Sequence, residues 1–584
     1  MSRDVRRRLS PLGLAVLAAA LVWPAQARAL ELTQLSERTL RLDLTATTVG
    51  NWHGDNRNNL DYDDDFGDLF NRVNIQLSWW RLVGAVRLDT AAFVAQPDPA
   101  ALALKHATDP NDSSEVNRLQ SRYWERLRSR HRDSIWLGKS FLTFSSPMLE
   151  VTAGDSYVSL GRGLVLSMRK DDELSSDSTL LGGKVLARLG WFSATLAGGV
   201  ANPVRVDEGT GQTLYPVDPS VAERARGIEE VPVFRQDRLF GGRLEGSGSL
   251  GSISLQGVHM LRPSTLDQTS GVRGARILDV GGGSASLSFP KGSGAAYVEG
   301  AYQRVDDEDG YAFYGSVSGI WGPVNGVVEW QHYREFKALL ATVHSTQADA
   351  FRFLQYSAPP TTEGLTADNR YGSFNEHVSG GRARVNGLVA PWLTAWGAVG
   401  YWATRGERLQ RLRNDVVDGM AGAEIYFDEH RSHLFASAGA RRDWQDEDGA
   451  LYYREFHVEG SAAKALSGPW SLEIEGLYRR RFHTTENTQD GVPEPWSEAE
   501  LSLAAKYSPY VVAGFGVEYT GQKGQVRSDE EPLFFNGSLL VKYQSDASVR
   551  LFVGQQRGSL KCVSGICRQF APFEGVKLEW TQRY

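Results

Sequence analysis

Hydrophobic and polar residues alternate along the chain from one end to the other. Near the start, Leu40, Leu42 and Leu44 share one face of an extended segment, while Arg41 and Asp43 lie on the other. The same period of two recurs in later stretches, among them 72–79, 471–478 and 498–507. This period is typical of β-strands with one apolar and one polar face.

Short and long connections separate these stretches. Tight turns are expected at 290–294, 322–326, 427–432, 466–470, 507–510 and 543–548, and the longest polar connections at 201–237 and 338–373. This arrangement predicts a meander of β-hairpins with about 24–26 strands, least certain between residues 140 and 180.

The number of strands favours a single closed barrel over a soluble β-sandwich or propeller. A ten-residue strand tilted as in such barrels covers about 25 Å, the height of the apolar band of an outer-membrane barrel. So many strands in sandwiches would need several domains, yet no Pro/Ser-rich linker is present. Several strand faces end in aromatic residues, as interfacial girdles require: Trp79, Tyr302, Trp330, Trp402, Tyr507, Tyr519 and Tyr543. We predict an all-β, transmembrane antiparallel up-and-down barrel with short periplasmic turns and long extracellular loops.

The first residues have the composition of an export signal. Four arginines precede a short apolar run, and small residues follow it, which predicts a signal peptide over 1–29 with cleavage after residue 27 or 29. Residues 30–584 would form one barrel domain. Segment 1–27 carries four Arg and one Asp, so its removal changes the formal net charge from -7 to -10. This acidity argues against nucleic-acid binding, and no later stretch is apolar enough for a transmembrane helix.

The chain ends on a strand with an aromatic last residue. Val576, Leu578, Trp580 and Tyr584 occupy alternate positions. This ending resembles the C-terminal signature of bacterial outer-membrane proteins, from which Gln582 departs. The resemblance implies location in the outer membrane of a Gram-negative-type bacterium, contact with its lipids and recognition by the barrel-insertion machinery.

A second, narrower resemblance rests on two segments. "AGDSYVSLGRGLVLSMRKDDE" (153–173) and "GSLKCVSGICRQFAPFEGVKLE" (558–579) are similar to members of a bacterial family of outer-membrane barrels known only as a domain of unknown function. This resemblance implies the same fold and location, and it supplies no activity or site residues.

Charged residues at alternate positions are candidates for the lining of the lumen. Read as a strand, Arg118, Arg122 and Arg126 share one face, which would have to avoid lipid. They would form an anion track or pair with acidic residues that fill the interior, although Leu119 and Tyr123, four apart, also fit a helix. By alternation the later strands turn charged residues inward: Glu455, Glu459, Glu473, Glu475, Arg479, Arg481, Glu498 and Glu500.

Neither metal binding nor cofactor binding is expected. Asp61, Asp63 and Asp65 have the spacing of a calcium loop, but Phe66 and Arg72 stand where that loop needs Gly and Glu. A solvated hairpin tip is the better interpretation.

Cys562 and Cys567 are the only cysteines. In an oxidising compartment they predict a structural disulfide that fixes a loop. Their spacing does not suit a redox motif, and one pair supplies only half a zinc site.

These observations favour a porin-like channel for passive or selective diffusion of small polar or charged solutes, without catalysis. The first alternative is a non-conducting barrel, its lumen filled by loop 338–373, that binds a surface or periplasmic partner. A membrane-embedded lipid hydrolase using His332, His457 or His483 is the second. A plug domain is not expected, because the first strand starts about ten residues after the cleavage site. The oligomeric state is not indicated.

Overall fold

The structure is a computed structural model. It describes residues 30–584 apart from 36–37, 58–60, 132, 207–214, 217–232, 264, 268–270, 274–275, 306–307, 345–353, 361–376, 406–412, 446–448, 486, 490–491, 524–530, 559 and 564–565. The predicted signal peptide lies outside the described residues.

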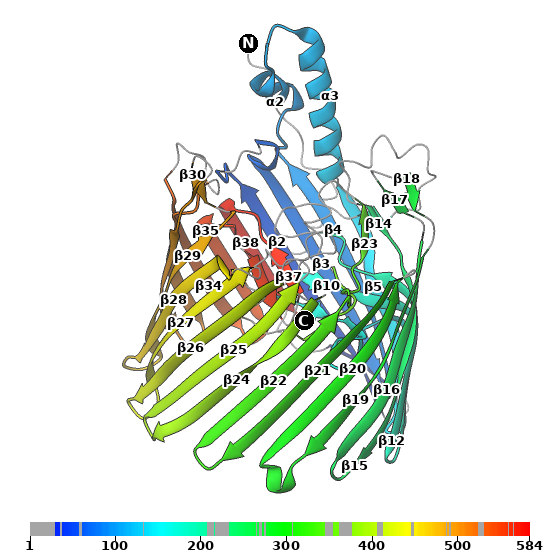
Figure 1. The fold of residues 1–584 in the computed structure, drawn as a ribbon. Coiled ribbons are helices and arrows are strands. Elements are labelled where there is room, and N and C mark those ends of the chain that lie inside the picture. Colours follow the sequence, from blue (N-terminus) through cyan, green and yellow to red (C-terminus); the bar gives the residue numbers. More distant parts are fainter. Residues whose placement is uncertain are drawn as a thin grey trace.

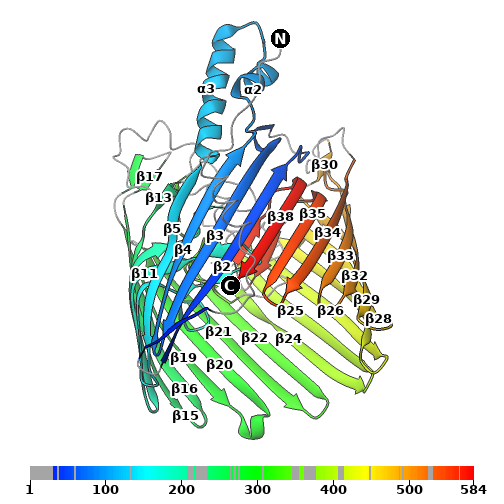
Figure 2. The same ribbon diagram turned by 180° about the vertical axis from the view of Figure 1, so that it is seen from behind.

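One antiparallel sheet closes on itself as a barrel (Figures 1 and 2). Within the described residues it has 24 strands, and β38 pairs with β2 to close it. The first half of the barrel contains β2 (Arg38–His53), β3 (Phe66–Trp79), β4 (Leu82–Val94), β5 (Ser134–Ser145), β6 (Leu149–Ser156), β11 (Thr179–Leu189), β12 (Phe192–Asn202), β15 (Arg238–Gly248), β16 (Gly251–Arg262), β19 (Arg276–Ser288), β20 (Gly294–Val305) and β21 (Glu308–Trp321).

The second half continues in the same sense with β22 (Val324–Arg334), β24 (His377–Ala390), β25 (Leu393–Arg405), β26 (Arg413–Phe427), β27 (Ser432–Gln445), β28 (Ala450–Ala465), β29 (Trp470–His483), β32 (Trp496–Tyr507), β33 (Val511–Thr520), β34 (Leu533–Gln544), β35 (Ala547–Gln556) and β38 (Phe573–Arg583). A further strand, β1 (Leu30–Leu35), pairs with the first part of β2. The predicted fold class is confirmed.

The outer surface of the barrel is apolar. On β16, Ile253 and Leu255 are exposed, whereas Ser254 and Gln256 between and beside them are buried. Successive side chains of a strand point to opposite faces, so the exposed apolar positions form the outside of the wall. Such an exterior suits the hydrocarbon of a membrane.

The connections at the lower end of the barrel in Figure 1 are all short, with two to five residues between consecutive strands, and most of those at the other end are longer. By the usual rule for these barrels the short turns are periplasmic and the longer loops at the other end extracellular. Trp191, Trp321 and Trp470 are exposed beside short turns, where aromatic girdles are expected. Trp402 was predicted to belong to a girdle, and that is wrong: its side chain is buried on the inner face of β25.

The arginine-rich segment is a helix and not a strand. α2 (Pro99–His106) and α3 (Ser113–Arg130) form a hairpin between β4 and β5 that stands beyond the extracellular end of the wall (Figure 1). Arg118, Arg122 and Arg126 therefore do not lie on a barrel strand, and their predicted place on the lumen wall is wrong. Asp112 caps α3 by accepting hydrogen bonds from the backbone N–H groups of Ser114 and Glu115. Among the described residues no helix is long and apolar enough to cross a bilayer.

The C-terminal strand completes the wall. Val576 and Leu578 are exposed on its outer face, and the backbone N–H of Tyr584 donates to the Leu44 carbonyl oxygen at 2.7 Å. Gln582, the residue that departs from the expected pattern, is buried and accepts a hydrogen bond from the hydroxyl of Tyr543. Tyr543 also accepts from the indole N–H of Trp580 at 2.7 Å, so a polar residue is tolerated here because aromatic side chains enclose it.

Candidate functional site in the lumen

Residues 157–178, between β6 and β11, fold away from the wall, and we call them the partition. They contain four short strands: β7 (Val158–Leu160), β8 (Leu166–Met168), β9 (Lys170–Asp171) and β10 (Ser176–Asp177). Their polar contacts reach β20 and β21 as well as the neighbouring strands. The partition therefore spans the lumen from one side of the wall to another.

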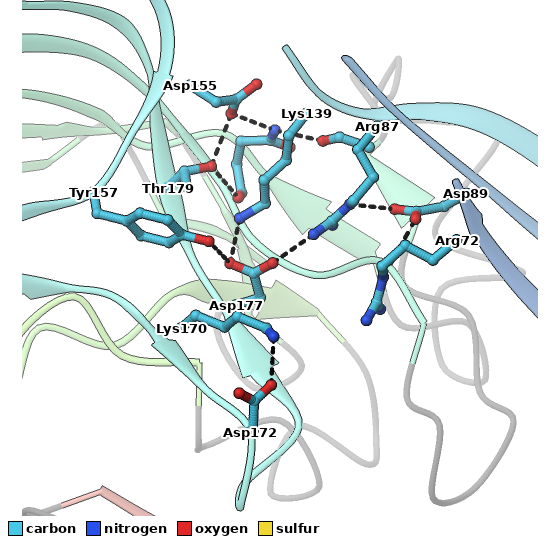
Figure 3. A network of polar contacts seen from close by, with 12 residues as sticks. Arg72, Arg87, Asp89, Lys139, Asp155, Tyr157, Lys170, Asp172, Asp177 and Thr179 are labelled. Atoms are coloured by element: carbon cyan, nitrogen blue, oxygen red, sulfur yellow. Dashed lines mark hydrogen bonds and ion pairs between the residues drawn. The ribbon is translucent and has the colours of Figure 1, made fainter. Parts of the chain in front are cut away.

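Two buried carboxylates anchor the ends of the partition (Figure 3). At its end, Asp177 accepts from Arg87 Nη1 at 2.6 Å, from the Tyr157 hydroxyl at 2.9 Å and from Lys139. Just before its start, Asp155 accepts from the Thr179 hydroxyl and the Asn202 amide, both at 2.8 Å. Each carboxylate has several donors, which offsets the cost of its burial.

The tip of the partition docks on the opposite wall. The backbone N–H of Arg162 donates to the fully buried Glu299 carboxylate at 2.8 Å, and the Arg162 guanidinium lies 4.1 Å from the ring centre of Tyr297. Gly161 and Gly163 have φ of +67° and +102°. A Cβ at Gly161 would collide with the Glu299 carboxylate, so the Gly-Arg-Gly sequence is what this close approach requires.

An apolar core lies beneath and around the partition. Its buried members on the partition include Leu160, Leu164, Leu166 and Met168. They pack with inward-facing residues of the wall from β11 to β26, such as Leu180, Met260, Val280, Tyr333 and Trp402, and with Leu339, Leu354 and Tyr356 of the long loop after β22. One side of the barrel interior is therefore packed like a protein core.

The other side of the interior is charged. On β28, β29 and β32, Arg481 forms ion pairs with Glu455 at 2.7 Å and with Glu498 at 3.0 Å. Arg557, which follows β35, reaches Glu498 at 2.9 Å and Glu500 at 3.1 Å. Its guanidinium also lies 4.0 Å from Glu518 on β33. We call the following inward-facing charged residues of this side the carboxylate wall: Glu455, Glu459, Arg479, Arg481, Glu498, Glu500, Glu518 and Arg557.

The predicted lumen-facing residues on the later strands share one face with this network. They alternate with exposed outer residues such as Phe456, Leu472 and Leu501. Glu459 accepts from the Ser437 hydroxyl at 2.8 Å, and Glu473 pairs with Lys506. Glu475 and Arg479 occupy the same inward parity on β29. Arg557, Arg441 and Asp443 were not predicted from the sequence to face the lumen. For Arg557, the available signal was that a charged residue directly follows the end of a strand.

The acidic residues that have the spacing of a calcium loop lie in a loop that contacts α2. Asp61 lies in a short 3-10 helix, 2.5 Å from Lys105 Nζ and 2.8 Å from His106 Nε2, so it ties its loop to α2. Within the described residues, no group of three or more His, Cys, Asp or Glu could hold a metal ion.

The cysteines lie on a small hairpin of β36 (Leu560–Val563) and β37 (Ile566–Gln569), where Cys562 is directly opposite Cys567 in the backbone register. Their side chains lie outside the described part of the chain, and the disulfide stays a prediction. The next residue, Arg568, donates to the Leu174 carbonyl oxygen at 2.6 Å, so this hairpin rests on the partition.

The three histidines considered for a hydrolase are dispersed. His332 stacks on Trp330, whose side chain is exposed on the outer face of β22. His457 lies 3.2 Å from Glu455 in the carboxylate wall, and His483 contacts the Thr485 hydroxyl at 3.0 Å.

No protein-family model matches the chain, and no curated protein matches it in sequence. Among solved structures, a ferric enterobactin receptor from Pseudomonas aeruginosa is 9% identical, covering 93% of this chain and 81% of the receptor with a TM-score of 0.46. A BenF-like porin from Pseudomonas fluorescens is 11% identical, covering 73% of this chain and 99% of the porin with a TM-score of 0.35.

The barrel itself defines the class of protein. A closed antiparallel ring of 24 strands with an apolar exterior, short turns at one end and long loops at the other is the architecture of bacterial outer-membrane proteins. The chain therefore has the architecture of an outer-membrane β-barrel.

Proposed function

We propose that this barrel is a porin-like channel in which small polar or charged solutes diffuse between the partition and the carboxylate wall. The observation that carries the proposal is the exposure of inward-facing charged side chains on this side of the lumen. The side chain of Glu500 is 40% exposed and that of Lys506 37% exposed, although both face inward. Inward carboxylates and ammonium groups in contact with water are the lining that a hydrated pore needs.

The partition acts as a fixed constriction and not as a lid. Seven of its apolar side chains are 2% exposed or less: Val158, Leu160, Leu164, Val165, Leu166, Met168 and Leu174. At about 1.5–3 kcal/mol for each buried side chain, their burial contributes on the order of 10–20 kcal/mol. A lid that opens and closes could not expose so much apolar surface, so solutes would pass beside the partition.

The test compares two neighbouring residues on opposite faces of β32. Glu500→Trp puts a bulky side chain into the proposed passage, and Leu501→Trp puts the same side chain into the lipid-facing surface. In planar bilayers we expect Glu500→Trp to lower the single-channel conductance and Leu501→Trp to leave it unchanged. Equal conductance in both variants would place the passage elsewhere.

A second candidate is a non-conducting receptor, and the filled half of the lumen favours it. Leu339, Leu354 and Tyr356 of the long loop after β22 pack against the partition, as the alternative of a loop-filled lumen requires. A folded wild-type barrel without conductance steps would support this candidate. Replacement of residues 158–176 by a Gly/Ser linker should then create conductance.

The proposal assigns the barrel no catalytic role. Its partners would be the lipids of the outer membrane, the insertion machinery that recognises Val576, Leu578, Trp580 and Tyr584, and small solutes. We propose that the chain also belongs to the narrower family of unknown function, since segment 153–173, on which that resemblance rests, contains most of the partition.

A further inference from the structure

Three arginines face outward on adjacent strands of the barrel. Arg442 on β27, Arg454 on β28 and Arg480 on β29 are all exposed. On β28, Arg454 shares the outer face with Phe456, which is 47% exposed, whereas Glu455 between them faces the lumen. The three guanidinium groups therefore belong to the lipid-facing surface and not to the lumen.

The arginines lie at one level of the wall. Arg442 is three residues before the end of β27, Arg454 four residues after the start of β28, and Arg480 three residues before the end of β29. These ends of the strands are on the extracellular side (Figure 1). A lipid-facing arginine is most costly at the bilayer midplane and least costly near the interfaces. This level suits the headgroups of the outer leaflet, and Phe456 and Val458 lie below it, towards the acyl chains.

The register of the strands brings the positive charges together. Arg442 is directly opposite Arg454, and Phe456, two residues beyond Arg454, is directly opposite Arg480. Cβ atoms of directly opposite residues are about 5 Å apart and those of diagonal neighbours about 7–8 Å. Like charges placed directly opposite each other destabilise a sheet. An anion bound between the arginines would remove this repulsion.

Within the described part of the chain, none of the three guanidinium groups pairs with a carboxylate. Their contacts are with aromatic rings: that of Arg442 lies 5.6 Å from the ring centre of Trp444, and that of Arg454 lies 6.0 Å from that of Phe482. Asp415, an outward acid on the neighbouring β26, accepts from the Tyr401 hydroxyl at 2.9 Å.

Outward charges on another part of the wall are paired at the same end of the barrel. Arg304 on β20 lies 3.3 Å from Asp309 on β21, and His259 on β16 lies 2.6 Å from Asp279 on β19. The outward arginines of β27, β28 and β29 thus differ from these residues in having no acid of the described chain beside them.

We propose that Arg442, Arg454 and Arg480 bind the phosphate groups of lipopolysaccharide in the outer leaflet. The lipid A anchor of this glycolipid carries phosphates above several acyl chains, which would lie along Phe456 and Val458. Each guanidinium presents N–H donors in a fork that matches a phosphate. The inference names one lipid partner of the barrel. It rests on the outer-membrane location and does not require the channel to conduct.

The test measures the affinity of the purified, folded barrel in a non-ionic detergent for lipid A that carries both phosphates. Arg454→Gln should raise the Kd at least about tenfold, because it removes charge-assisted hydrogen bonds to phosphate. Arg304→Gln is the matched control, since it removes an outward arginine that already has a carboxylate partner. Its Kd should stay within about twofold of the wild-type value.

The folded state of the variant is checked without lipid. Arg454→Gln removes the repulsion with Arg442, so its melting temperature in detergent should be at least that of the wild type. Added lipid A should raise the melting temperature of the wild type and of Arg304→Gln more than that of Arg454→Gln. Equal lipid affinity in the wild type and Arg454→Gln, or an equal loss in Arg304→Gln, would overturn the inference.

The chemistry of the ligand is tested separately. Lipid A without phosphates should bind the wild type at least about tenfold more weakly. Inorganic phosphate in about hundredfold excess should not displace lipid A, because it lacks acyl chains to contact the apolar face. Displacement would overturn the lipid as ligand and indicate a site for free phosphate. Tight binding of the dephosphorylated lipid would overturn the role of the arginines.

The acidic residues Asp446, Glu447 and Asp448, between β27 and β28, lie outside the described residues, and a variant tests them. If the arginines are open to lipid, Asp446→Asn/Glu447→Gln/Asp448→Asn should change the Kd for lipid A by no more than about threefold, as expected for exposed charges. Binding more than about tenfold tighter in this variant would show that the loop neutralises the arginines in the native protein, and would overturn the inference.

Discussion

The two halves of the barrel interior are built on the same strand pattern and differ in what faces inward. From β11 to β26 the inward residues include apolar side chains that pack against the partition, and from β27 to β35 they include charged side chains that pair with each other. Alternation fixes only which side chains point inward. The chemistry of those side chains then decides whether that half becomes a packed core or a hydrated surface.

The largest effect is expected where charge is buried on the packed side. Asp177→Asn would leave Arg87 and Lys139 buried without their shared carboxylate. We expect a loss of about 3–5 kcal/mol in the free energy of unfolding, because uncompensated buried charge is costly. Urea unfolding in lipid vesicles, followed by tryptophan fluorescence, measures it.

Asp172→Asn is the control for Asp177→Asn, since the Asp172 side chain is 80% exposed and pairs with Lys170 on the surface of the partition. Its free energy of unfolding should stay near the wild-type value. A similar loss in both variants would mean that the anchor does not hold the partition.

A smaller effect is expected at the tip of the partition. Gly161→Ala puts a methyl group against Glu299 at a φ of +67° and should cost about 2–3 kcal/mol. Gly322→Ala has nearly the same φ, +60°, but among the described residues no heavy atom beyond its chain neighbours lies within 4 Å of the new methyl group, so about 1 kcal/mol is expected. Equal losses by urea unfolding would show that the tip is not closely docked.

The charged side should tolerate the loss of a partner better than the packed side. Arg481→Met removes one partner from Glu455 and Glu498, but Glu498 keeps Arg557 and water reaches the wall. We expect a loss of about 1–3 kcal/mol. Arg550→Met, at a 61% exposed side chain 3.8 Å from Glu579, should change the free energy of unfolding by less than about 0.5 kcal/mol. If Arg481→Met lowered the free energy of unfolding as much as Asp177→Asn does, water would be excluded from both sides of the barrel interior.

The strands of the barrel wall could be predicted from the sequence, but the partition that fills part of the lumen could not. Alternation identified β28, β29 and β32 and the inward parity of Glu455, Arg481 and Glu498, because a lipid-facing strand leaves few choices of register. The partition was missed, because its strands are only two or three residues long and its apolar residues pack into a core inside the lumen. Its Gly-Arg-Gly tip became meaningful only beside Glu299, which is 137 residues away in the chain.

The arginine segment shows a different source of error. Residues four apart share a face in a strand and also nearly share one in a helix, so Arg118, Arg122 and Arg126 fit both structures. The decisive signals were at the start of the helix: Asp112 as its cap, and Glu115, whose side chain accepts from the backbone N–H groups of Thr108 and Asp109.

The smallest effect concerns a buried carboxylate that lies among other acids. Asp64, in the extracellular loop between β2 and β3, is buried near Asp63, Asp55 and Asp61, and burial and these charges raise its pKa to about 7. The folded loop therefore binds a proton that the unfolded loop releases near pH 4. The stability of the loop should fall as pH rises from about 4 to 7 and stay low above that range.

Asp64→Asn should remove this pH dependence. The amide keeps an oxygen to accept the hydrogen bond from the backbone N–H of Asn56, 3.1 Å away, without a charge. Loop amides should then exchange with deuterium more slowly than in the wild type at pH 8, by the equivalent of about 1–2 kcal/mol, and at the same rate at pH 4. Asp65→Asn, at the exposed neighbouring residue, should change neither rate. An equal slowing in both variants would show that the net acidity of the loop matters and the burial of Asp64 does not. Slowing in Asp64→Asn alone would show that burial of a carboxylate among other acids, without a buried cation such as those beside Asp177 and Glu498, destabilises the folded loop at neutral pH.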